Sequence, residues 1–219
     1  QQADGVSASA KYEGKLSGFH WGSWPPVQVD FTVTVPASYN VELKTSGGDI
    51  TVSALKGMVD GETSGGNIHV KGIEGPVTME TSGGKVRIEQ MTGNVHIETS
   101  GGNITASDVK GSLVVNTSGG NIEIGAIDGK ITAETSGGDV SVQLNGANRG
   151  VYVETSGGDI DIRVPATISA TVDASTSGGD VTCDLPITMN GKLDESRIRG
   201  TVNGGGEMIR ARTSGGNVR

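Results

Sequence analysis

The chain has 219 residues, of which 37 are glycine, 33% are apolar and only 3% are aromatic. Its formal net charge is −8 and it has no run of lysine or arginine, so nucleic acid is not expected as a partner. Glycine follows no Gly-X-Y period, which excludes collagen; no stretch approaches 18 apolar residues, which excludes a membrane-spanning helix; and a single cysteine excludes an internal disulfide.

Residues 1–44 are expected to form an N-terminal strand and capping region. The first residue is Gln1 and not methionine, as in a mature or trimmed form. Alternating apolar residues predict strands over Val27–Pro36, VQVDFTVTVP, and over Val41–Leu43. A preceding stretch contains the aromatic residues Phe19, His20, Trp21 and Trp24. Exposed aromatic side chains bind sugar faces and form binding hot spots, so this stretch is a candidate ligand-binding site; the alternative is a hydrophobic lid over the first coil.

Residues 45–185 are organised by a repeat. The tetrapeptide TSGG occurs nine times in the chain, beginning at Thr45, Thr63, Thr81, Thr99, Thr117, Thr135, Thr155, Thr176 and Thr213. Successive copies from Thr45 to Thr135 are 18 residues apart, and a fixed period of this size is typical of a solenoid. Each period holds two runs of alternating apolar and polar residues, which predict two short strands with one apolar face.

Aligning the periods places apolar residues in columns that we expect to face inward. One column reads Ile50, Ile68, Val86, Ile104, Ile122, Val140, Ile160, Val181 and Val218. A second begins at Val52 and Val70 and ends at Cys183, which we therefore interpret as a small core residue. The fold class that satisfies these columns is an all-β, right-handed parallel β-solenoid of about 18 residues per coil, with divergent terminal capping regions. Parallel crossovers favour the right-handed form, and successive coils are ~4.8 Å apart.

The TSGG tetrapeptide is predicted to form a corner that every coil repeats. Glycine permits a positive φ or a close approach of two backbones, and the Thr and Ser hydroxyls satisfy turn amides. The Asn and Asp residues that follow TSGG are interpreted as turn residues that form a ladder. A second glycine column marks the opposite corner: Gly57, Gly75, Gly93, Gly111 and Gly129.

Residues 186–219 are expected to be irregular C-terminal coils, because the rhythm breaks between Pro186 and Gly206 and 37 residues, about two periods, separate the last two TSGG copies. Solenoids need atypical terminal units to cover the core and the exposed strand edge. We expect the three regions to form one structural domain.

An acidic strip is the second candidate site. The outward position before TSGG is occupied in successive coils by Glu62, Glu80, Glu98, Glu134 and Glu154. Such a strip is expected either to collect Ca²⁺ or a basic surface, or to be a solvated charged face. Asn116 interrupts it and favours the second alternative. The GG-[ND] segments also resemble the calcium-binding nonapeptide repeat, but its second glycine and its aspartate are missing, so no metal is expected there.

Catalysis is not expected. His69 and His96 lie at outward positions of different strands, and His20 lies in the aromatic stretch. The chain contains no G-x-S-x-G, H-E-x-x-H or Cys/His cluster, so neither a nucleophile with its base nor a metal centre is predicted. An ice-binding surface would need two outward ranks of threonine, and the sequence supplies one.

Several segments resemble a bacterial family of proposed adhesins, domains of unknown function with TSGG repeats. These are Phe31–Gly57, FTVTVPASYNVELKTSGGDITVSALKG; the recurring G-x-[VIL]-x-[VMIA]-x-TSGG-[ND]-[IV] unit; and Asn203–Val218, NGGGEMIRARTSGGNV. The resemblance covers roughly residues 27–219. It implies a right-handed β-helix-like fold and a location in the cell envelope or outside the cell. It supplies no catalytic residues.

The sequence therefore predicts a non-enzymatic, envelope-associated or secreted binding scaffold of the adhesin type, without a cofactor. The expected partner is a protein or glycan surface ligand. One alternative is a structural solenoid that self-associates end to end. Another is a β-helix that binds or processes polysaccharide, for which fold alone is no argument.

Overall fold

The computed structural model describes residues 29–189 and 195–219. Within them it contains eighteen β-strands and no helix, and so no helix that is long and apolar enough to span a membrane. The aromatic candidates Phe19, His20, Trp21 and Trp24 lie outside the described residues. The chain divides into two compact units, residues 1–35 and residues 36–219.

The described part of the first unit, residues 29–35, forms no strand, so the strand predicted over Val27–Pro36 is wrong there. The alternation does create an apolar face, and Val29, Phe31 and Val33 are exposed. A β-strand also needs a neighbouring strand to complete its backbone hydrogen bonds, and none of the described strands pairs with these residues.

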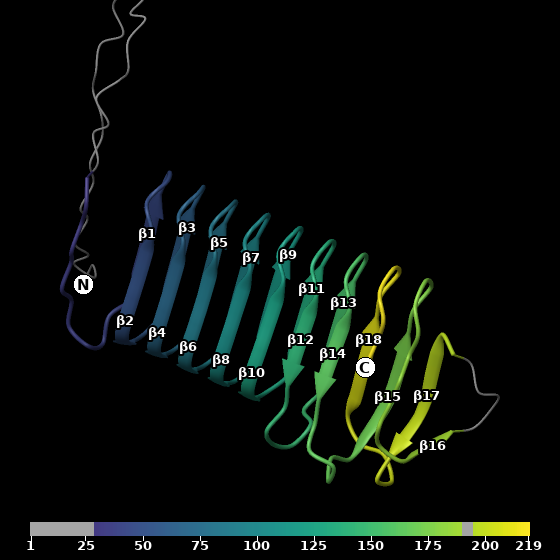
Figure 1. Cartoon of the computed structure of the whole chain (residues 1–219). Helices are drawn as coiled ribbons and strands as arrows, with labels where there is room; N and C mark the ends of the chain where they lie inside the picture. The colour runs from purple at the N-terminus through teal and green to yellow at the C-terminus, as the bar shows by residue number, and fades with distance from the viewer. Residues whose placement is uncertain (1–28, 190–194) are drawn as a thin grey trace, which may run out of the picture. The chain divides into compact units, whose positions relative to one another are not determined.

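The second unit is a parallel β-solenoid made of two sheets (Figure 1). In spatial order, the eleven-stranded sheet consists of β1 (Val41–Thr45), β3 (Val59–Thr63), β5 (Val77–Thr81), β7 (Val95–Thr99), β9 (Leu113–Thr117), β11 (Ile131–Thr135), β13 (Val151–Thr155), β18 (Met208–Arg212), β15 (Ala170–Ser175), β17 (Arg197–Val202) and β16 (Ile187–Met189). The seven-stranded sheet consists of β14 (Ile160–Arg163), β12 (Val140–Gln143), β10 (Ile122–Asp128), β8 (Ile104–Lys110), β6 (Val86–Thr92), β4 (Ile68–Glu74) and β2 (Ile50–Lys56).

The register confirms the predicted 18-residue coil. Val41 pairs with Val59 and Val59 with Val77 in one sheet, and Ile50 pairs with Ile68 in the other. The predicted inward columns form the core between the sheets: Ile68, Ile104, Leu113 and Ile131 are at most 1% exposed. Val and Ile suit this core because β-branched side chains pack well on a pleated surface.

Five of the coils also contain a corner that was not predicted from the sequence. In strands β2, β4, β6, β8 and β10, the fifth residue has a left-handed backbone. The angle φ is 56° at Ala54, 66° at Gly72, 58° at Gln90, 54° at Asp108 and 55° at Ala126. Pairing skips these positions, since Ser53 pairs with Lys71 and Leu55 with Ile73. The signal was the spacing of inward residues such as Val70 and Ile73, which lie three residues apart and therefore break the two-residue alternation of a strand.

The C-terminal segment does not stack in chain order. Strand β18 inserts between β13 and β15 and pairs in parallel with both (Figure 1). Val218 bridges to Ile160 on one side and to Val181 on the other, so the predicted order of these three residues is wrong. Residues 208–219 thus form a regular internal coil, where irregular terminal coils were expected.

The physical reason is the direction of β17, which runs antiparallel to β15 and to β16. The antiparallel strand β17 reverses the direction of the chain, and the chain then returns as β18 between β13 and β15. Cys183 lies just beyond Val181, where strand pairing ends, and is exposed. The interpretation of Cys183 as a core residue is therefore wrong.

Candidate functional site

The five predicted glutamates stand in one row on the outer face of the eleven-stranded sheet. Register pairs Glu62 with Glu80, Glu80 with Glu98, and Glu134 with Glu154. Asn116 occupies the intervening position on β9. We call this row, including Asn116, the acidic row. Neighbouring strands are ~4.8 Å apart, so its carboxylates repel one another by roughly 1–3 kcal/mol per pair at surface dielectric values.

Side chains next to the acidic row hold three of its carboxylates. Lys44 Nζ lies 3.8 Å from Glu62 Oε2, and His96 Nε2 lies 3.2 Å from Glu98 Oε1. The Tyr152 hydroxyl donates a hydrogen bond to Glu154 Oε2, which raises the pKa of Tyr152 because the neutral phenol is the donor. The His96 and Tyr152 contacts lie along one strand, whereas Lys44 reaches Glu62 from the neighbouring strand β1.

The threonine of TSGG faces inward, as the corner requires. Thr117 is 7% exposed, donates its hydroxyl hydrogen to Gly102 O at 3.1 Å in the preceding coil, and accepts from Gly120 N–H at 3.2 Å in its own coil. The same pair of bonds recurs at Thr63, Thr81, Thr99, Thr135, Thr155 and Thr213. The predicted role of the threonine hydroxyl is confirmed, and this column presents no hydroxyl to a ligand.

The residues after TSGG form the predicted ladder. Asn103 Oδ1 accepts from the backbone N–H of Asn121 at 3.0 Å, and Asn121 Oδ1 accepts from that of Asp139 at 2.9 Å. Asp159 continues the ladder by accepting from Asn217 N–H at 2.6 Å. Lys85 has no acceptor atom in its side chain and interrupts it. These side chains are therefore engaged in holding successive coils together.

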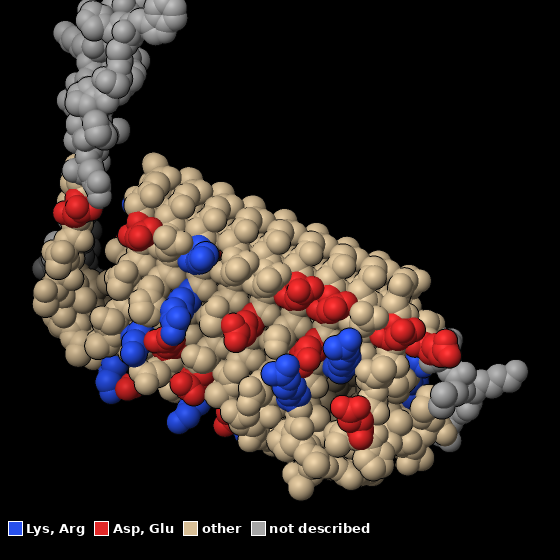
Figure 2. All heavy atoms as spheres, viewed as in Figure 1, with Lys and Arg blue, Asp and Glu red and all other residues tan. Residues whose placement is uncertain are grey.

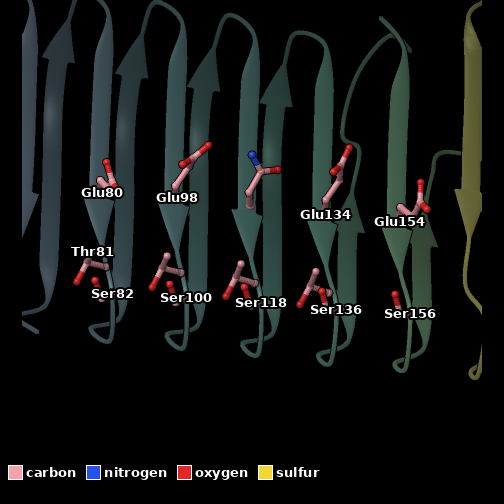
Figure 3. Close-up of a pocket in the computed structure, with 14 residues that line it drawn as sticks. Glu80, Thr81, Ser82, Glu98, Ser100, Ser118, Glu134, Ser136, Glu154 and Ser156 are labelled. Atoms are coloured by element: carbon pink, nitrogen blue, oxygen red, sulfur yellow. The ribbon is translucent and has the colours of Figure 1, made fainter. Parts of the chain in front are cut away.

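The serine of TSGG faces outward and lines a groove with the acidic row. The groove has a volume of about 440 Å³ and runs across β5, β7, β9, β11 and β13 (Figure 3). Its walls are the acidic row from Glu80 to Glu154 and a serine row that comprises Ser82, Ser100, Ser118, Ser136 and Ser156. The serine wall was not predicted from the sequence. The signal was the two-residue spacing from glutamate to serine, which places both outward on either side of an inward threonine.

A second groove of about 330 Å³ follows at the C-terminal end, where β18 and β15 continue the sheet. It is lined by Glu154, Arg197, Arg212 and serines 175, 177 and 214, together with inward threonines. The groove thus passes from carboxylates to guanidinium groups. In Figure 2, which shows one face of the molecule, the edge where the strands turn carries no charged side chain, although charged side chains lie directly below it.

The histidines do not assemble a catalytic or metal centre in the part of the chain that the structure describes. His69 Nε2 lies 3.8 Å from Glu89 Oε2 and belongs to the seven-stranded sheet, whereas His96 belongs to the other sheet. No group of three or more His, Cys, Asp or Glu residues among the described ones is placed to hold a metal ion.

A family model described as Toastrack DUF4097, a domain of unknown function, matches residues 13–219. The chain belongs to this family. A row of stacked, evenly spaced strands fits the Toastrack name (Figure 1). No curated protein and no solved structure matches the chain. Membership of the Toastrack family therefore agrees with the solenoid and assigns no ligand or activity, and the adhesin role implied by the motifs stays a prediction.

Proposed function

We propose that this Toastrack protein is a non-enzymatic binding scaffold of the bacterial envelope or the cell exterior, an adhesin in the sense that its groove holds a ligand surface. The observation that carries the proposal is the pairing of the acidic row with the serine row along a groove of about 440 Å³. Carboxylates accept hydrogen bonds from lysine and arginine, and serine hydroxyls both donate and accept. The ligand that this chemistry favours is an extended segment rich in basic groups.

Repetition supplies the affinity. One exposed ion pair contributes only about 0–1 kcal/mol, but the groove offers four carboxylates and five serines at a regular spacing. A ligand that spans the groove engages several of them at once. Because the groups are exposed, the binding is expected to weaken strongly as salt is added.

The acidic row is a poor candidate for carboxylate catalysis. Enzymes that use two carboxylates place them in different environments, so that one is a proton donor and the other a base or nucleophile. The four glutamates of the groove occupy one equivalent position in successive coils and are all exposed, so none of them has the buried, apolar environment of a carboxylic acid that donates a proton. This argument favours a scaffold over the polysaccharide-processing alternative.

The end-to-end alternative is also less favoured. The last described strand of the eleven-stranded sheet at the C-terminal end is β16, which has only three residues and pairs antiparallel with β17. A short antiparallel strand does not offer the parallel edge that another solenoid would extend.

The test is binding of an oligolysine peptide and of a glycan panel to the purified chain, at low and at high salt. Two variants each place an arginine in the same coil. Asn116→Arg lies on β9 inside the groove, and Thr105→Arg lies on β8 in the other sheet. Asn116 and Thr105 are both half-buried, so the two substitutions are matched. We expect saturable oligolysine binding that Asn116→Arg weakens and Thr105→Arg retains. No oligolysine binding, or an equal loss in both variants, would refute the proposal.

The Trp21→Ala/Trp24→Ala double variant is measured alongside, because it tests the aromatic stretch separately from the groove. Glycan binding that this variant loses would favour recognition by the aromatic stretch. Unchanged glycan binding would count against it.

A further inference from the structure

Four arginines surround one buried aspartate on the outer face of the eleven-stranded sheet. Asp173 lies on β15 and is 5% exposed. Its carboxylate oxygens lie 2.9 Å from Arg199 Nε, 3.3 Å from Arg197 Nη2, 3.4 Å from Arg210 Nε and 3.7 Å from Arg212 Nη2. Arg197 and Arg199 come from β17, and the other two come from β18.

The cluster holds an excess of positive charge. Four guanidinium groups face one carboxylate, which leaves three positive charges uncompensated within the cluster. The hydrogen bond from Arg199, the largest cause, keeps the pKa of Asp173 below its ordinary value, so the carboxylate is ionised at neutral pH. Like charges held this close favour a bound anion. The excess is local, since the whole chain has a net charge of −8.

Two of the arginines line the groove of about 330 Å³ beside the cluster. Arg197 and Arg212 contribute guanidinium donors, and Ser175, Ser177 and Ser214 contribute hydroxyls. The side chains of Arg197 and Arg212 are each 42% exposed, so they remain accessible although Asp173 orients them. Arg197 Nε is itself shielded from solvent and has no hydrogen-bond partner. Guanidinium groups with nearby hydroxyl donors are the groups that bind phosphate and sulfate oxygens.

We propose that this groove, the arginine pocket, is a binding site for a phosphoryl or sulfate group. It shares Glu154 with the acidic row, but its lining sets two guanidinium groups against that one carboxylate, so it takes a ligand of the opposite charge. Asp173 acts as a positioning residue: it fixes the arginines by charge-assisted hydrogen bonds and leaves their remaining donors to the ligand. A volume of about 330 Å³ leaves room for a larger molecule that carries this group.

The pocket exists because of the inserted strand. β18 places Arg212 next to Glu154 of β13, and it places Arg210 next to Asp173 of β15. β17 adds its two arginines from the other side of β15. The alternating pairs Arg197–Arg199 and Arg210–Arg212 are visible in the sequence, but only the topology brings them to one aspartate.

The first measurement is calorimetric titration of the chain with inorganic phosphate and with inorganic sulfate, against chloride at equal ionic strength. The Arg197→Gln/Arg212→Gln variant keeps Arg199 and Arg210 on Asp173, and we expect it to bind at least tenfold more weakly. Arg163→Gln is the matched control, because Arg163 is an exposed arginine on β14 that pairs with Asp161. It is expected to bind as the unsubstituted chain does.

A second variant tests the pocket without replacing any arginine, so a loss of binding is not due to misfolding of the arginine cluster. Ser214→Asp adds a negative charge at an exposed position of the pocket and leaves every arginine in place. We expect the same loss of phosphate binding, with an unchanged thermal melt. The proposal is overturned if the unsubstituted chain binds neither ion beyond chloride, or if Ser214→Asp binds as tightly as the unsubstituted chain.

The source of the group is distinguished with vesicles. Both phosphatidylglycerol and phosphatidylcholine vesicles present phosphoryl groups, but only the phosphatidylglycerol surface has a net negative charge. Binding to the former that Ser214→Asp abolishes would support a lipid headgroup as the source. Binding of the inorganic ions without vesicle binding would support a soluble phosphorylated or sulfated ligand. Asn116→Arg should leave both results unchanged, which separates this proposal from the proposed function.

Discussion

Replacement of Thr117 by valine tests the main stabilising device of the solenoid. The two side chains have the same shape, so the substitution leaves the packing in place and removes only the hydroxyl. Two hydrogen bonds are lost: the one donated to Gly102 O at 3.1 Å and the one accepted from Gly120 N–H at 3.2 Å. Both glycines are buried, so water does not replace the lost partner.

The magnitude follows from the two groups left unsatisfied. Each buried donor or acceptor without a partner costs about 1–3 kcal/mol. The added methyl group of valine offsets at most about 1 kcal/mol through burial. We therefore expect Thr117→Val to lower the free energy of unfolding by about 3 kcal/mol. Thr117→Ser keeps the hydroxyl and loses one buried methyl, which costs about 1 kcal/mol.

The assay is chemical denaturation followed by far-ultraviolet circular dichroism, with hydrogen exchange of the Gly120 amide as a local probe. Ser118→Ala is the control, because Ser118 is the exposed neighbour of Thr117, and it should change the free energy of unfolding by less than about 0.5 kcal/mol. Our reasoning would be refuted if Thr117→Val were as stable as Thr117→Ser. The threonine column would then act through its shape alone.

Three further predictions concern the glycine corner, the Asn/Asp ladder and the arginine cluster. Gly120→Ala should lower the thermal midpoint far more than Gly119→Ala. A Cβ at position 120 would lie 1.9 Å from a carbonyl oxygen of the preceding coil, whereas a Cβ at position 119 would meet no atom nearer than 3.7 Å. Equal thermal midpoints would contradict the close stacking of the corners. Lys85→Asn should raise the free energy of unfolding by about 1 kcal/mol in denaturant titrations, because it supplies the missing acceptor for the Asn103 N–H; Lys85→Ala should not. The pKa of Asp173 is lower when folded, so its stabilisation is present above its ordinary value of 3.8 and is lost as the pH falls through the folded value. Denaturation at a series of pH values should show this decline in the free energy of unfolding. Asp173→Asn should be less stable at pH 7 by about 3 kcal/mol and should lack the part of the decline that comes from Asp173.

The repeat made most of the solenoid predictable. A column such as Ile68, Val86 and Ile104 can only face one way in a regular coil, so burial followed from alternation. The role of the TSGG corner followed from chemistry, because a corner stacked on its own copy needs a glycine where backbones approach closely and a hydroxyl where a turn amide is buried. Identical local sequences imposed identical local structures.

The errors arose where the repeat gave no information. Cys183 fits the inward column by spacing, but strand pairing ends at Val181, and a column exists only where a neighbouring coil continues it. The left-handed corner at Ala54 and Gln90 has no common residue type, so composition does not mark it. The serine wall of the groove was missed because the tetrapeptide was interpreted as structural throughout.

The insertion of β18 has the largest consequence for function. Stacking in chain order would place Ser175 next to Glu154 and leave Arg212 outside it. The observed order places Arg212 next to Glu154, with Ser175 beyond it. The reordering therefore sets the guanidinium groups directly against the end of the acidic row, and one continuous face takes opposite charge at its two ends. A ligand that carries both basic and phosphoryl or sulfate groups would match this face along its length. The groove and the arginine pocket would then act as two parts of one surface, each disabled by its own variant.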